Sequence, residues 1–225
     1  MYSQRFLKAC NRYALLIGGS GRNLTHGISE VARYLCDAAG FDNGNVVQFN
    51  PQSKSEAQSI PDVMRAFYNN VRRDQQAATI FLYHGHGEVG CIRPFQGVDV
   101  PYEDLAGEIN YDGPLLVIID ACHSASALPV FHKVANQVHV SCGHDQRAWR
   151  MAFLPAFFYS MVQRRPFRRR RVGSPRIEKQ PIFSYSKLGD YYIGRLRQGI
   201  ELVQVEDYQH PQRAGSGLES LLYPR

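Results

Sequence analysis

A cysteine and a histidine each follow an apolar run, and this placement indicates nucleophilic chemistry. The run 114–119 leads into Cys122, and the run 78–83 leads into His86. Continuous apolar runs of this length are typical of strands buried on both faces of a parallel sheet. Because functional groups gather beyond the carboxyl ends of such strands, we expect Cys122 and His86 to meet at one edge of the sheet.

A thiol beside an imidazole is the pairing that nucleophilic cysteine catalysis needs. A free thiol has a pKa of about 8.5, so the imidazole of His86 would help to remove its proton and later return it. The backbone N–H groups of Gly87 and Cys122 would stabilise a substrate oxyanion. The alternatives are a buried, inert Cys122 and a His86 that is satisfied by a backbone carbonyl.

Predicted strands and helices alternate along the chain, which favours an α/β fold. We expect roughly six strands in a mostly parallel sheet, with helices on both faces and right-handed crossovers. All of 1–225 is interpreted as one domain. The expected strands are 13–17, 45–49, 78–83, 114–119, 138–141 and 200–205, and the expected helices are 24–39, 61–71, 102–109, 151–163 and 187–197.

Bulk composition is that of an ordinary soluble globular protein, with 44% hydrophobic and 20% charged residues among 225. The longest apolar stretch, 151–162, is too short to span a membrane, and no targeting segment is evident. We therefore expect a cytoplasmic protein, with a monomer favoured. A reducing compartment also fits the odd number of scattered cysteines, which are Cys10, Cys36, Cys91, Cys122 and Cys142.

Arginine is concentrated in one segment. Seven arginines and no acidic residue fall within 164–176, and they account for the net charge of +6. Three prolines lie in 164–182, which we interpret as a mobile basic insertion. It could be a solvated loop, a nuclear-localisation or nucleic-acid patch, or a site of cleavage. Nucleic-acid binding is the weaker interpretation because a single aromatic residue, Phe167, lies among the arginines.

The two motifs together resemble those of caspase-like cysteine peptidases, and of metacaspases in particular. Residues 83–87 read Tyr-His-Gly-His-Gly and residues 120–125 read Asp-Ala-Cys-His-Ser-Ala. Further likeness covers 24–41, 141–146 and 209–216. The resemblance implies a caspase-like fold and a cysteine endopeptidase, in which a Cys122–His86 dyad cleaves peptide bonds through a thioester.

The resemblance also implies a substrate preference. In metacaspases the aspartate two residues before the nucleophile lines the first substrate pocket, which makes Asp120 a candidate for binding Arg or Lys. Glu30 and Asp145 are further candidates for this pocket, and a helix N-cap is the alternative role of Asp120. Partners would be proteins or peptides with basic residues. Autocleavage would then occur in the basic insertion, at Arg165, Arg168, Arg169, Arg170 or Arg171.

Two other functions stay open. His84 and Ala125 depart from the metacaspase motifs, and a catalytically silent module for binding or regulation would tolerate such changes. A legumain-like asparaginyl peptidase is the alternative within the enzymes. We expect no cofactor or metal, because the His and Cys spacing is not that of a structural zinc module and no acidic cluster supports activation by calcium.

Overall fold

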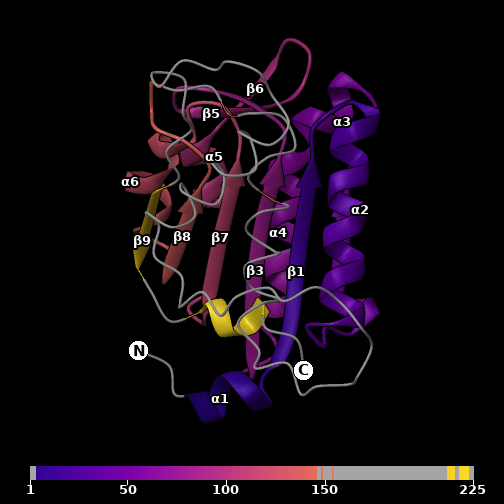
Figure 1. Cartoon of the computed structure of the whole chain (residues 1–225), viewed down its shortest axis with the longest axis vertical. Coiled ribbons are helices and arrows are strands. Elements are labelled where there is room, and N and C mark those ends of the chain that lie inside the picture. Colours follow the sequence, from indigo (N-terminus) through magenta and orange to yellow (C-terminus); the bar gives the residue numbers. More distant parts are fainter. Residues whose placement is uncertain (1–3, 146–147, 149–153, 155–211, 216–217, 223–225) are drawn as a thin grey trace, which may run out of the picture.

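A computed structural model of the chain describes residues 4–145, 148, 154, 212–215 and 218–222. Its central element is a six-stranded sheet in the order β2-β1-β3-β7-β8-β9 (Figure 1). All neighbouring strands are parallel except β8 and β9. The strands are β1 (Asn11–Gly18), β2 (Val46–Phe49), β3 (Ala77–His84), β7 (Leu115–Asp120), β8 (Gln137–Val140) and β9 (Gln212–Gly215).

Helices pack on both faces of this sheet. One face is covered by α4, α5 and α6, and the other by α1 and α2. Within the described ranges, no helix is long and apolar enough to cross a membrane. The α-helices are α1 (Gln4–Ala9), α2 (Arg22–Asp37), α3 (Lys54–Gln58), α4 (Ile60–Val71), α5 (Tyr102–Gly107) and α6 (Leu128–Phe131), and the 3₁₀ helices are Asn43–Asn45, Ser124–Ala127 and Glu219–Leu222.

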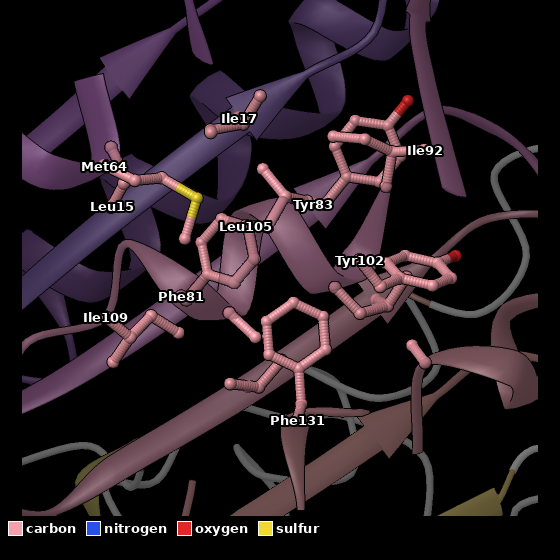
Figure 2. Close-up of a cluster of buried hydrophobic side chains, with 14 of the residues drawn as sticks. Leu15, Ile17, Met64, Phe81, Tyr83, Ile92, Tyr102, Leu105, Ile109 and Phe131 are labelled. Atoms are coloured by element: carbon pink, nitrogen blue, oxygen red, sulfur yellow. The ribbon is translucent and has the colours of Figure 1, made fainter. Parts of the chain in front are cut away.

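The central strands are buried because alternate side chains enter two separate hydrophobic clusters. Phe81 and Tyr83 of β3 lie in the cluster under α4 and α5, whereas Ile80 and Leu82 point to the α2 side. Figure 2 shows the first cluster, in which Phe81 packs against Phe131 with ring centroids 5.9 Å apart. This two-sided burial fixes where β3 and β7 end, and so where the polar residues after them lie.

A second, smaller sheet lies between β3 and α5 in the sequence. It is antiparallel, in the order β4 (His86–Glu88), β5 (Cys91–Phe95) and β6 (Val98–Pro101). Gly90 and Gly97 join these strands with positive φ angles of 82° and 72°, which favour glycine. His86 is the first residue of β4, so this small sheet is the support of the predicted base.

The structure confirms the expected α/β fold and most of the expected elements within the described residues. It adds α1, α3, α6 and the three strands of the small sheet, which the sequence analysis missed. An antiparallel β9 at 212–215 closes the sheet at the β8 edge. The elements expected at 151–163, 187–197 and 200–205 and the insertion 164–182 lie outside the described residues, so the single-domain interpretation stays a prediction.

Candidate active site

A cleft of about 550 Å³ brings the two predicted reactive residues together at the carboxyl end of the sheet. Cys122 is partly exposed and His86 is exposed, so the cysteine is not buried as the structural alternative expected. The lining side chains come from the segment after β1, from β4 and β5, and from the turn after β7. They are Ser20, His86, Gly87, Glu88, Arg93, Phe95, Gln96, Cys122 and His123.

Close contact between two backbone segments sets the positions of His86 and Cys122. A Cβ atom on Gly87 would lie 2.7 Å from the carbonyl oxygen of Cys122 and 2.9 Å from the Cβ of Ala121. Only glycine lets β4 approach the turn this closely. The N–H of Cys122 makes no hydrogen bond to another described residue, so it is available as a donor in the cleft.

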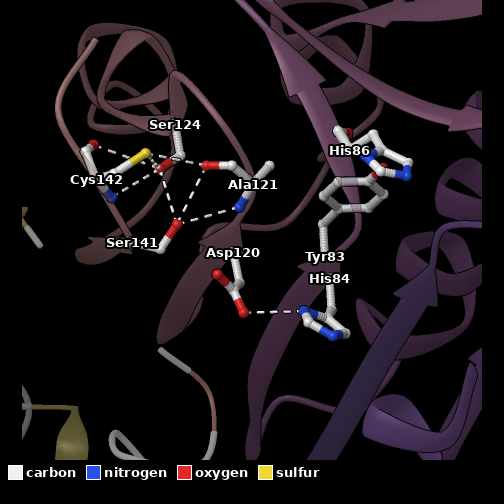
Figure 3. Close-up of polar contacts among 8 residues, drawn as sticks. All are labelled: Tyr83, His84, His86, Asp120, Ala121, Ser124, Ser141 and Cys142. Carbon is white, nitrogen blue, oxygen red and sulfur yellow. Dashed lines mark hydrogen bonds and ion pairs between the residues drawn. The ribbon is translucent and has the colours of Figure 1, made fainter. Parts of the chain in front are cut away.

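Hydrogen bonds from the end of β8 hold the cysteine turn in place (Figure 3). The hydroxyl of Ser141 accepts from the N–H of Ala121 at 3.2 Å and donates to its carbonyl at 3.1 Å. Ser124 accepts from the N–H of Cys142 at 3.1 Å. Burial raises the pKa of the Cys142 thiol, which stays protonated and donates to the carbonyl of Ala121 at 3.2 Å. Cys142 is therefore a structural residue.

Two further contacts lie close to the Sγ atom of Cys122, one made by His123 and one by the backbone of Ala148. His123 has a φ of 57°, which is uncommon for a residue with a side chain, and its Nδ1 lies 2.8 Å from the carbonyl oxygen of His144. The backbone N–H of Ala148 donates to the Sγ of Cys122 at 3.3 Å. The sulfur therefore faces a hydrogen-bond donor as well as the open cleft.

Asp120 is buried beside His84 and does not line the cleft. Only 3% of its surface is exposed, and its Oδ2 lies 2.9 Å from the Nδ1 of His84. The Oδ1 of Asp120 and the Nε2 of His84 have no partner among the described residues. The N-cap alternative is wrong, because His123 occupies that position of the Ser124–Ala127 helix and Asp120 makes no capping bond.

Neither of the other two predicted acidic residues lines the cleft that the described residues form. Glu30 is exposed on α2 and pairs with Arg33 one turn along the helix. Asp145 is exposed, with its Oδ1 4.0 Å from the Nδ1 of His144. The expected pocket of three carboxylates is therefore not assembled there. The predicted autocleavage residues, Arg165 and Arg168 to Arg171, lie outside the described residues.

An acidic residue that the sequence analysis missed does line the cleft. Glu88 of β4 forms an ion pair with Arg93 at 2.9 Å, and Arg93 also binds Asp99 at 2.6 Å. Glu88 follows His86 by two residues, so strand alternation brings both to one face of β4 once the strand is known. In the described part of the chain, no group of three or more His, Cys, Asp or Glu residues is placed to hold a metal ion.

Comparisons with known proteins identify the fold. No family model and no curated protein matches the chain. Caspase-1 from Spodoptera frugiperda matches with a TM-score of 0.58 at 15% sequence identity, over 92% of this chain and 89% of that one. A secreted C11 cysteine protease from Bacteroides thetaiotaomicron, in complex with an irreversible peptide inhibitor, gives a TM-score of 0.39 at 13% sequence identity. The match covers 66% of this chain and 54% of that one. The chain therefore has a caspase-like fold, as the likeness to caspase-1 shows.

Replacing His84 with leucine is expected to lower the free energy of unfolding by about 3 kcal/mol, because the buried carboxylate of Asp120 then loses its partner. Urea denaturation measures this change. The double variant His84→Leu/Asp120→Leu removes both polar groups and should recover part of the loss. The exposed His132→Ala serves as control and should change stability by less than about 0.5 kcal/mol. A double variant that is as unstable as the sum of both single variants would contradict the pairing.

Proposed function

We propose that this chain is a cysteine endopeptidase with Cys122 as nucleophile and His86 as general base and acid. The observation that carries the proposal is that Cys122 and His86 line one cleft of about 550 Å³. The caspase-like fold and the resemblance of both motifs to those of metacaspases support it. Nucleophilic catalysis by a thiol requires this arrangement, a base within reach and room for a peptide carbonyl.

The proposed reaction has two halves. The thiolate of Cys122 attacks the scissile carbonyl, and the backbone N–H groups of Gly87 and Cys122 stabilise the oxyanion that forms. The protonated imidazole of His86 then gives its proton to the departing amine as the C–N bond breaks, which leaves a thioester on Cys122. In the second half His86 deprotonates a water molecule, which attacks the thioester and releases the acid and the thiol.

For the substrate we propose a preference for Arg or Lys on the amino side of the cleaved bond. The metacaspase-like position of Asp120 supports this preference. Proteins or peptides with basic residues would be the substrates.

Hydrolysis of short fluorogenic peptides ending in Arg, Lys, Asn or Asp, with and without calcium, tests the activity. The wild-type protein should cleave after Arg and Lys, and Cys122→Ala or His86→Ala should lower kcat/KM by about 10⁴-fold. Cys36→Ala, at another partly exposed cysteine, should leave the rate unchanged. Cleavage after Asn would favour the legumain-like alternative. A folded wild-type protein that cleaves none of the four would favour a silent binding module.

Gly87→Ala tests the oxyanion site. The added methyl group would meet the carbonyl of Cys122, so β4 must move away and one donor is lost. We expect kcat/KM to fall by about 100-fold, the usual cost of such a donor. Gly107→Ala in α5 is the matched control, because its Cβ would meet nothing within 4 Å. Equal kinetics for the two variants would argue against a role for the Gly87 N–H.

Autocleavage follows from an Arg preference and a segment rich in arginine. We expect wild-type protein to convert slowly to two fragments whose masses place the cut after Arg165, Arg168, Arg169, Arg170 or Arg171. Cys122→Ala protein should stay intact under the same conditions. Intact-mass spectrometry over time measures this, and a wild-type protein that is active on peptides but stays whole would contradict the prediction.

A further inference from the structure

A tyrosine hydroxyl binds the backbone of the proposed base. Tyr83 is fully buried near the end of β3, and its hydroxyl donates to the carbonyl oxygen of His86 at 2.7 Å. Figure 3 shows the Tyr83 ring directly beneath His86. The hydroxyl forms no hydrogen bond with Cys122 and does not line the cleft, so we expect any effect on the chemistry to pass through His86.

The surroundings of Tyr83 keep its hydroxyl protonated and in place. Burial raises the pKa of Tyr83 well above its ordinary value, although a hydrogen bond from the backbone of Arg93 opposes this. The hydroxyl therefore stays a donor at all working pH values. Arg93 is the residue that pairs with His86 across β4 and β5, so Tyr83 lies beneath the first pair of this hairpin.

The Tyr83 ring also fills the space under the turn between β3 and β4. A Cβ atom on Gly85 would lie 2.3 Å from the hydroxyl oxygen of Tyr83. Two backbone hydrogen bonds hold the turn itself. The N–H of Gly85 donates to the carbonyl of Asp120 at 3.0 Å, and the N–H of Gly19 donates to the carbonyl of His84 at 2.8 Å. The chain therefore cannot shift toward the core at this point while Tyr83 is present.

The imidazole of His86, in contrast, makes no hydrogen bond to another described residue. The His86 backbone therefore sets the point from which the ring projects and the direction of its Cα–Cβ bond, and no described side chain adds a hydrogen bond to the ring. We propose that Tyr83 is a positioning residue: its hydroxyl holds the His86 carbonyl and thereby places the imidazole of His86 near Cys122 in the cleft. The catalytic consequence rests on the proposed function, whereas the positioning itself does not.

Tyr83→Phe removes the hydroxyl and keeps the ring, which makes it the test variant. Tyr68→Phe is the matched control, because Tyr68 is equally buried in the same cluster and its hydroxyl has no partner among the described residues. The first readout is the ¹³C–¹H resonance of the His86 ring, assigned by its loss in His86→Gln. We expect it to shift or broaden in Tyr83→Phe and to stay unchanged in Tyr68→Phe. An unchanged resonance in Tyr83→Phe overturns the proposal.

The second readout is steady-state kinetics on the best Arg or Lys peptide. A misaimed base should lower kcat by about 10- to 100-fold while KM changes less than about twofold. A merely structural Tyr83 would lower the melting temperature and leave kcat unchanged, and this result also overturns the proposal. If the wild-type protein cleaves no peptide, the proposed function fails, and the His86 resonance alone still decides whether Tyr83 positions the ring.

Gly85→Ala is a second variant that displaces the hydroxyl without removing it. Its methyl group would collide with the Tyr83 oxygen, so the bond to the His86 carbonyl must lengthen or break. We expect the His86 resonance to shift or broaden in this variant, as in Tyr83→Phe. A resonance that moves in neither variant would show that the ring is held by something other than this hydroxyl.

Discussion

The cleft depends on one contact between backbone segments, the approach of β4 to the cysteine turn at Gly87. His86 precedes Gly87, and the carbonyl of Cys122 lies where a side chain at Gly87 would be. Each segment is held from its other side, the turn by Ser141 and Ser124 and β4 by the Tyr83 hydroxyl. The backbone segments that carry His86 and Cys122 are thus fixed relative to each other by contacts within the chain, as the preorganised site that we propose requires.

Burial divides the polar residues at this end of the sheet into two sets. His84 and Asp120 come from paired positions of β3 and β7 and face the α2 side, where they bind each other away from water. His86 and Cys122 lie two residues further on, beyond the strands, and face the cleft. A shift of two residues therefore separates a buried hydrogen-bonded pair from the solvent-accessible pair that we propose to be reactive.

Long apolar runs were the part of the fold that could be predicted from sequence. Strands buried on both faces, such as 78–83 and 114–119, need such runs, and the residues after them follow by simple geometry. The strands of the small sheet have three to five residues and mixed polarity, so pattern alone did not reveal them. Strand register and side-chain direction could not be predicted either, which is why the sequence analysis missed the partner of Asp120 and the hydrogen bond from Tyr83 to His86.

The antiparallel β9 has a consequence for the nascent chain. β8 pairs with β7 on one side, and among the described strands only 212–215 covers its other side. This covering strand leaves the ribosome long after β8, so β8 spends part of synthesis as an unpaired edge, which is prone to join other chains. Correct assembly of the protein thus depends on keeping that edge apart from other chains until residues 212–215 have been made.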